Sequence, residues 1–176
     1  MAPSADELQR NMFYNENWSV AMEFTFLGVL VQEITVGIAE PGYPDSYAIR
    51  VGMLEVNQTY GTFYDYNFFE SKVRRLYERF LRFSKVLCLP GVLYDLITKE
   101  LSADQFVWDT AMERSPWIRI YVNKANPAWD DLSTIFTNPV DFPVRFQDAN
   151  VHAPENAVHD TAEVISLSPN SDTNSE

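Results

Sequence analysis

The sequence has little of what metal-dependent and nucleophilic enzymes require. Among its 176 residues there is one cysteine, Cys88, and there are two histidines, His152 and His159. A single cysteine cannot form an internal disulfide or supply a cysteine cluster for zinc or an iron–sulfur centre. Both histidines follow the last aromatic residue, Phe146. We therefore expect a folded part without an imidazole base or ligand, which favours a non-enzymatic protein without a metal.

Glycine is also sparse, and its six residues are isolated from one another. The motifs GxGxxG and GxxxxGKS/T, which cradle nucleotide phosphates, do not occur. Long apolar runs are missing too, because the stretch from Leu27 to Val31 is too short to cross a bilayer and the polar N-terminus lacks the pattern of a secretory signal. These absences predict an intracellular protein, of the nucleus or cytoplasm, that needs no cofactor.

Basic residues are outnumbered. The chain has 13 lysines and arginines against 25 acidic residues, which gives a formal net charge of −12. A surface of that sign repels the phosphates of nucleic acid and of anionic lipid. The charge balance therefore predicts protein partners and argues against nucleic acid as a partner.

Composition changes sharply after Phe146. All 25 aromatic residues lie in residues 1–146, whereas residues 147–176 contain six acidic residues and no lysine or arginine. A segment so poor in large apolar side chains cannot offset the entropy cost of ordering its backbone. We therefore predict one globular domain over residues 1–146 and a disordered acidic tail over residues 147–176.

Residues 18–64 show an alternation of apolar and other side chains, which is typical of half-buried strands. The turn-forming residues 40–45 interrupt it. The pattern predicts an antiparallel sheet of three or four strands. Its alternating positions are Trp18, Val20, Met22, Phe24 and Phe26, then Ile34, Val36 and Ile38, then Tyr47, Ile49, Val51 and Met53.

Residues 68–88 change to the period of an amphipathic helix. The sequence therefore predicts an α+β fold in which the sheet packs on one long helix. The apolar stripe of this helix is Phe69, Val73, Leu76, Phe80, Phe83 and Leu87, at spacings of three and four. We also expect short helices near residues 5–14, 93–101, 105–114 and 127–136, and strands at residues 117–122 and 140–146.

The same helix carries six of the 13 basic residues of the chain. We expect these bases on its outer face, where they would form a docking surface for an acidic partner. A solvated face with no partner would explain them equally well. The six residues are Lys72, Arg74, Arg75, Arg79, Arg82 and Lys85.

A second hypothesis is a small-molecule-binding or hydrolytic α+β domain. Tyrosines supply polar tips in an apolar wall, and carboxylates could supply acid–base chemistry or bind a hard cation. Packing of a core would account for the aromatic residues as well. The candidates are the aromatic residues Tyr60, Phe63, Tyr64, Tyr66, Phe68 and Phe69 and the carboxylates Asp130, Asp131 and Asp141.

The tail contains one apolar tetrad, Val164-Ile165-Ser166-Leu167, flanked by acidic and serine residues. It resembles a SUMO-interacting motif, a short segment that adds a β-strand to the edge of a partner's sheet. The resemblance implies binding to a SUMO-type modifier through Val164, Ile165 and Leu167. Together with the basic helix it favours a non-enzymatic interaction or adaptor protein.

Overall fold

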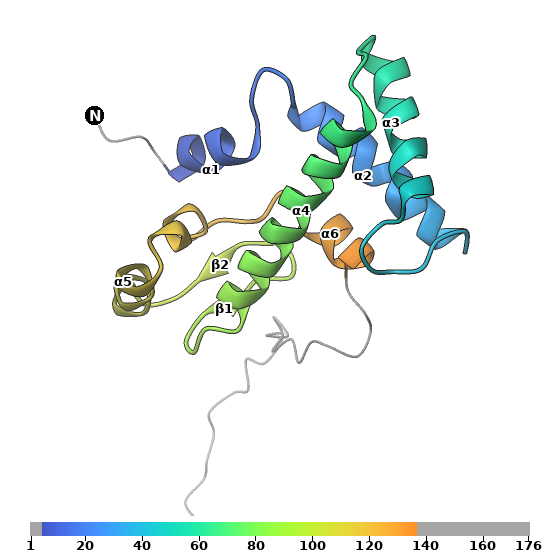
Figure 1. The fold of residues 1–176 in the computed structure, drawn as a ribbon. Coiled ribbons are helices and arrows are strands. Elements are labelled where there is room, and N and C mark those ends of the chain that lie inside the picture. The colour runs from blue at the N-terminus through green and yellow to red at the C-terminus, as the bar shows by residue number, and fades with distance from the viewer. Residues whose placement is uncertain (1–4, 137–176) are drawn as a thin grey trace, which may run out of the picture.

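Helices make up most of the structure. The computed structural model describes residues 5–136, and α4 runs diagonally through the molecule with the other elements on its two sides (Figure 1). The first four helices are α1 (Ala5–Phe13), α2 (Val20–Thr35), α3 (Ser46–Tyr60) and α4 (Tyr66–Leu87). The strands β1 (Leu93–Tyr94) and β2 (Leu101–Ser102) then form an antiparallel hairpin, followed by α5 (Gln105–Arg114), the 3-10 helix η1 (Pro116–Ile120) and α6 (Trp129–Phe136).

The predicted α+β fold is wrong, because α2 and α3 occupy the region assigned to the sheet. Among the described residues the two-residue strands of the hairpin form the only sheet. The alternation in residues 18–64 coincides with helical spacing. In α3, for example, Ile49, Gly52 and Val56 are buried at spacings of three and four, and Ala48 is buried beside Ile49.

Side-chain caps start both of the helices that the prediction missed. The Ser19 hydroxyl accepts a hydrogen bond from the Met22 amide at 3.2 Å, and Asp45 Oδ1 accepts one from the Ala48 amide at 2.9 Å. Each cap satisfies an amide that has no partner within its helix. A search for caps followed by helical spacing would have found both elements.

The predicted long helix is present as α4. It begins at Tyr66, where Asp65 accepts the capping hydrogen bond from the Phe68 amide. Its apolar stripe is buried as predicted from Phe69 to Phe83, and Leu87 at the end of the stripe is half-buried. Of the other local predictions, some are confirmed and some are wrong. Helices α1, α5 and α6 match expected segments, whereas residues 93–101 form a hairpin instead of a helix and residues 117–122 include η1 instead of a strand. Residues 140–146 lie outside the described residues.

The first half of α4 contributes to one hydrophobic core, here called the first cluster. Helices α2 and α3 pack against each other and α6 packs across α2 and α4. Gly52 lies where α3 packs against α2, and a β-carbon there would be 2.6 Å from the Phe26 ring. The buried members are Trp18, Phe26, Leu27, Leu30, Ala48, Ile49, Val56, Phe69, Val73, Leu76, Phe80, Ala128, Leu132, Ile135 and Phe136.

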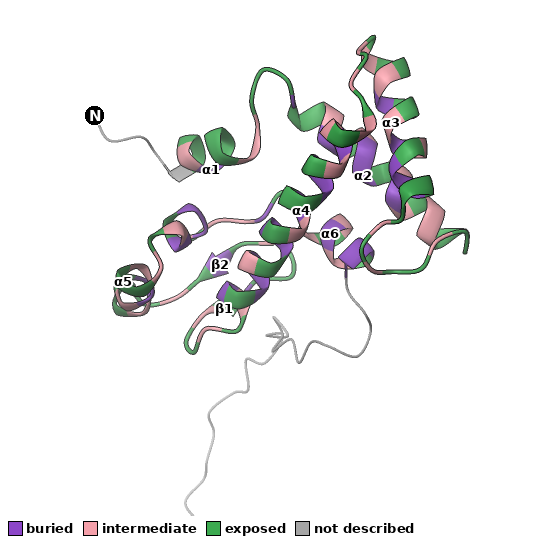
Figure 2. Ribbon diagram, in the orientation of Figure 1, coloured by how far each residue is buried: buried purple, intermediate pink, exposed green. Residues whose placement is uncertain are grey.

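The second half of α4 contributes to a second cluster, formed with the hairpin, α5 and η1; Figure 2 shows buried positions along the length of α4. Helix α1 is held beside this cluster by hydrogen bonds from its Gln9 side-chain amide to the backbone carbonyls of Ile120 and Ala125. The buried members of the second cluster are Phe83, Val86, Tyr94, Leu101, Trp108, Ala111, Ile118, Ile120 and Tyr121.

Candidate functional site

The connection between α3 and α4 fixes the direction of α4. Gly61 ends α3 in the left-handed conformation, with φ 64°. Asn57 then bridges the five-residue connection: its Oδ1 accepts from the Thr62 hydroxyl at 2.8 Å and the Tyr64 amide at 3.1 Å, and its Nδ2 donates to the Tyr64 carbonyl at 2.9 Å. Two helices are thereby held as a unit by a short polar turn, which the sequence analysis did not identify.

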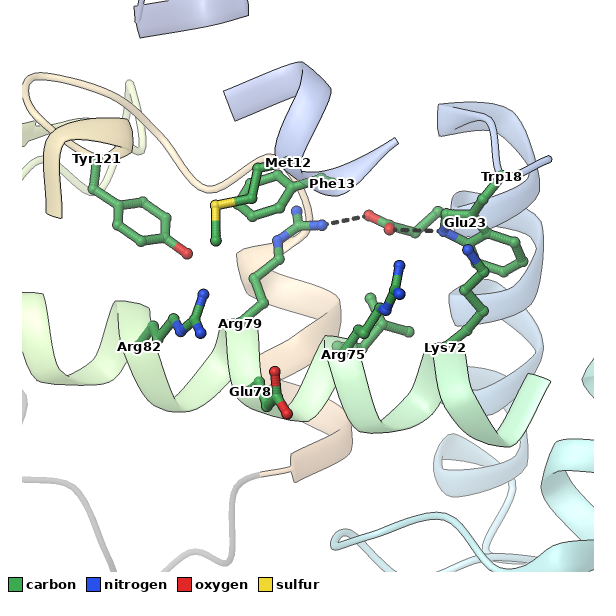
Figure 3. Close-up of a pocket in the computed structure, with 11 residues that line it drawn as sticks. Met12, Phe13, Trp18, Glu23, Lys72, Arg75, Glu78, Arg79, Arg82 and Tyr121 are labelled. Carbon is green, nitrogen blue, oxygen red and sulfur yellow. Dashed lines mark hydrogen bonds and ion pairs between the residues drawn. The ribbon is translucent and has the colours of Figure 1, made fainter. Parts of the chain in front are cut away.

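The six bases of α4 do not share one environment. Arg74, Arg75 and Lys85 are exposed and Arg82 is half-buried. Lys72 and Arg79 are buried, with 7% and 4% of their surface exposed, so the expectation that they lie on the outer face is wrong. Both point to the side of α4 on which Trp18 and α1 lie (Figure 3), where their long aliphatic stems can pack against apolar neighbours.

A continuous exposed face runs along α4. Asn67, Ser71, Arg74, Glu78 and Lys85 are exposed and recur at spacings of three, four and seven. None of the exposed or half-buried bases on this helix forms an ion pair with another described residue. Their charges are therefore available to a ligand in solution.

Arg79 forms the buried polar centre of the molecule. Its Nη1 donates to Glu23 Oε1 at 2.7 Å and its Nε donates to Asn126 Oδ1 at 2.7 Å. Its guanidinium also lies over the Phe13 ring, 4.0 Å from the centroid. One side chain thus joins α4 to α1, to α2 and to the segment that precedes α6.

Both carboxylate oxygens of Glu23 accept hydrogen bonds. Besides Arg79, the Tyr14 hydroxyl donates to its Oε1 at 2.9 Å, and the indole of Trp18 donates to its Oε2 at 3.2 Å. The carboxylate is thus neutralised and hydrogen-bonded on both oxygens, as a buried charge requires. Burial, reinforced by the Glu23 charge, raises the pKa of Tyr14 to about 12.

A cavity of about 190 Å³ lies beside this network, between α1, α4 and Tyr121 (Figure 3). Four bases and two acids contribute to its wall. In Figure 3 the Tyr121 hydroxyl points toward α4, between Arg79 and Arg82. The lining residues are Met12, Phe13, Trp18, Glu23, Lys72, Arg75, Leu76, Glu78, Arg79, Arg82 and Tyr121.

The pKa shifts in the cavity follow burial and charge. Burial raises the pKa of Tyr121 to about 12, although the positive charges of Arg79 and Arg82 partly oppose this shift. The pKa of Lys72 is lowered, first by burial and then by repulsion from Arg75, while the Glu23 charge acts in the opposite direction. At neutral pH Tyr121 is therefore a neutral hydroxyl donor among cations.

The residues of the small-molecule hypothesis occupy separate environments. Phe69 lies in the first cluster, Phe63 is 97% exposed, and the rings of Tyr64 and Phe68 stack with their centroids 4.1 Å apart. Among the described residues no group of three histidine, cysteine or acidic side chains could hold a metal ion. Asp130 pairs instead with Lys99 at 3.3 Å, and Asp141 lies outside the described residues.

Two further predictions concern other parts of the chain. Val164, Ile165 and Leu167 of the tail lie outside the described residues, so the SUMO-interacting motif and the domain boundary at residue 146 stay predictions. No helix within residues 5–136 has both the length and the hydrophobicity needed to cross a membrane.

Comparison with known proteins adds one finding. Neither a curated protein nor a solved structure matches the chain. The model of one family, the Myb/SANT-like DNA-binding domain, matches residues 17–111, from the residue before Trp18 to the middle of α5. This match corrects the expectation, drawn from net charge, that nucleic acid is not a partner. Because the matched residues make up more than half of the sequence, the chain belongs to the Myb/SANT-like DNA-binding domain family.

Proposed function

We propose that this protein binds double-stranded DNA through the exposed face of α4 and acts in the nucleus. The observation that carries the proposal is the placement of α4, which follows α3 after a short, hydrogen-bonded turn and leaves one polar face open along its length. In helix-turn-helix proteins the second helix of such a pair enters the major groove, and residues near its N-terminus contact the base edges. The family match supports the same reading.

The side chains on this face suit a DNA groove. Asn67 and Arg74 lie in the first part of α4 and are exposed. Asparagine and arginine are the side chains that most often form paired hydrogen bonds with adenine and guanine, respectively. Arg82 and Lys85 lie farther along the helix, where we expect them to contact phosphates and fix its position.

The net charge of −12 weakens DNA binding without preventing it. Helix α4 has six bases and two acids, so its local charge is opposite to that of the whole chain. Six of the acidic residues lie in residues 147–176. Charges more than about 8–10 Å away are largely screened at physiological salt, so the bases of α4 dominate at short range. We therefore expect modest affinity with a strong salt dependence.

The test is a titration of the full chain against a mixed-sequence DNA duplex, followed by fluorescence anisotropy. Between about 50 and 200 mM salt the logarithm of the association constant should fall linearly with the logarithm of salt concentration. About four phosphate contacts predict a slope of about −3.6. The double variant Arg74→Gln, Lys85→Gln should bind more weakly, and its slope should be shallower by about 1, because Lys85 is the one of the two that we expect to contact a phosphate.

The matched control is the double variant Arg10→Gln, Arg114→Gln. It removes the same charge from two exposed residues on α1 and α5. An equal loss of affinity in both variants would show that only bulk charge matters and would contradict a role for α4. An acidic peptide that binds α4 more tightly than the duplex would instead favour the acidic protein partner expected from the sequence.

A further inference from the structure

We propose that the cavity between α1, α4 and Tyr121 is a binding site for a single phosphate group. The cavity has a volume of about 190 Å³. Since a water molecule takes about 30 Å³, it has room for about six waters, or for one tetrahedral oxyanion with part of its hydration shell. This proposal is independent of DNA binding by the exposed face, because a free phosphate ester would satisfy it as well.

Two hydrogen-bond donors in the cavity wall have no partner. Arg79 Nη2 and the Tyr121 hydroxyl are buried and make no hydrogen bond to any described residue. Arg79 is 4% exposed and Tyr121 is fully inaccessible. Buried donors without acceptors are rare and cost free energy, so each calls for an acceptor in the space that both of them border. An oxyanion supplies acceptors to both.

The charges around the cavity also favour an anion. Lys72, Arg75, Arg79 and Arg82 line it, against Glu23 and Glu78. Glu23 already accepts hydrogen bonds from Arg79, Tyr14 and Trp18, and Glu78 lies exposed at the rim. The positive side chains are crowded, since repulsion from Arg75 contributes to the lowered pKa of Lys72. A bound anion would relieve that repulsion.

A phosphate group fits these donors better than a carboxylate. A phosphate monoester carries up to two negative charges and three strong acceptor oxygens, whereas a carboxylate carries one charge and two oxygens. Three guanidinium groups and a hydroxyl approach the cavity from α4 and from the residue after η1. Guanidinium groups pair with phosphate through parallel hydrogen bonds, which makes several arginines the expected composition of such a site.

The experiment titrates the full chain with inorganic phosphate at constant ionic strength and follows arginine side-chain signals by NMR and the melting temperature. Phosphate should shift the signals of Arg79 and Arg82 and raise the melting temperature, because a ligand that binds only the folded state stabilises it. Acetate at the same concentration should do neither. Equal effects of acetate and phosphate would overturn the assignment of a phosphate site.

Tyr121→Phe is the most informative variant because it removes the unpartnered hydroxyl and retains the buried ring. Phosphate affinity should fall about tenfold, since a hydrogen bond to a charged group is lost. Tyr94→Phe is the matched control, because Tyr94 is also a buried tyrosine with an unpartnered hydroxyl but does not line the cavity. Equal phosphate affinity in the two variants would overturn the proposal.

Charge variants test the same site without disturbing the core. Arg75→Gln with Arg82→Gln should weaken phosphate binding at least tenfold, whereas Arg74→Gln with Lys85→Gln, on residues of α4 that do not line the cavity, should change it about twofold or less. Glu78→Gln should strengthen binding about two- to threefold by removing a negative charge from the rim. Stronger phosphate binding in Glu78→Gln, against weaker binding in the arginine variant, cannot be explained by a general loss of folding.

Measuring duplex binding by the same variant distinguishes a DNA backbone phosphate from a free phosphate ester. If a backbone phosphate enters the cavity, Tyr121→Phe should weaken duplex binding as well as phosphate binding. If the ligand is a free phosphate ester, Tyr121→Phe should lower phosphate affinity and leave duplex affinity unchanged. Both results support the site, because the outcomes that contradict it concern binding of inorganic phosphate and not binding of the duplex.

Discussion

The two hydrophobic clusters share α4 but are built differently. The first cluster is built mainly on α2, α3 and α4, which have 15 to 22 residues and begin after side-chain caps at Ser19, Asp45 and Asp65, and is completed by the eight-residue α6. The second cluster surrounds the end of α4 with two-residue strands, the ten-residue α5 and the five-residue η1. Large aromatic side chains close it, among them Trp108 and Tyr121, both fully buried. Long capped helices therefore form one half, and aromatic side chains on short elements form the other.

Despite this difference, both clusters depend on residues near the end of the described chain. The family match ends at Ala111, within α5. The first cluster still requires Leu132, Ile135 and Phe136 of α6, and the second still requires Ile118, Ile120 and Tyr121. Both clusters are thus closed by residues that follow the matched segment. The buried Arg79–Glu23 pair, with Asn126 as a third partner, connects these late residues to α2 and α4.

Removing the residues that complete both clusters should have the largest effect on stability. A chain that ends at Ala111 loses seven side chains that are buried in the two clusters, and all of them except Ala128 are large. Each fully buried large apolar side chain contributes about 1.5–3 kcal/mol, and the total stability of a domain is about 5–15 kcal/mol. We therefore expect this fragment to show no cooperative thermal transition by circular dichroism. A chain that ends at Phe136 should retain one, and a folded 111-residue fragment would show that the late elements are dispensable.

Breaking the buried ion pair should have the next largest effect. Glu23→Gln leaves the Arg79 guanidinium buried without its counter-charge, which we expect to cost about 3 kcal/mol or more of unfolding free energy in urea titrations. Asp130→Asn is the control, since it breaks the pair with Lys99 at 3.3 Å, in which Asp130 is 70% exposed. That loss should be below about 1 kcal/mol. Similar costs for both substitutions would contradict the central role assigned to Arg79.

The sequence allowed α4 to be predicted but not its partners. The stripe from Phe69 to Phe83 lies on a helix whose other positions are polar, so its period is clear. Helix α2 lacks that contrast, because it exposes Val20 and Phe24 while it buries Phe26, Leu27 and Leu30. Its apolar residues therefore satisfy an alternating pattern as well as a helical one, and only the cap at Ser19 decides between them.

For the candidate site too, the sequence predicted one property and missed another. Composition identified the six bases of α4, but their burial depends on the elements that pack on each side of the helix. Arg79 is buried because α1, α2 and the segment near Asn126 meet over it, and the contacts with Phe13, Glu23 and Asn126 span 66, 56 and 47 residues of sequence. Local spacing contains no information about such contacts. The Tyr121 hydroxyl belongs to the cavity for the same reason.

Alkaline pH should weaken the second cluster through its tyrosines. Burial raises the pKa of both Tyr94 and Tyr121 from 10.0 to about 12. Below pH 10 both phenols are neutral in the folded and unfolded chain, and stability is fully retained. Between pH 10 and 12 only the unfolded chain ionises, so the unfolding free energy should fall by up to about 2–3 kcal/mol for the fully buried Tyr121.

Tyr121→Phe tests this pH dependence in phosphate-free buffer. The variant should lose less unfolding free energy than the natural sequence between pH 10 and 12, because phenylalanine does not ionise. Chemical denaturation at a series of pH values gives both curves. Identical curves would show that Tyr121 does not titrate with a raised pKa, and would contradict the tight burial of the second cluster.

Two glycines test how closely α2 and α3 pack in the first cluster. A β-carbon at Gly52 would lie 2.6 Å from two carbons of the Phe26 ring. Because Phe26 is fully buried, its ring has little room to move. Gly52→Ala should therefore destabilise the protein by about 1–3 kcal/mol, even though alanine favours helix formation.

Gly28→Ala is the matched substitution and should have the smallest effect, with the opposite sign. Gly28 lies inside α2, is exposed, and has no atom within 4 Å of its ideal β-carbon position. Alanine at that position reduces the entropy of the unfolded chain, so we expect a gain of about 0.5–1 kcal/mol in denaturant titrations. Since both substitutions add the same methyl group to a helix, the difference between them isolates the contact with Phe26. A gain at both positions would show that α2 and α3 pack less closely than the structure indicates.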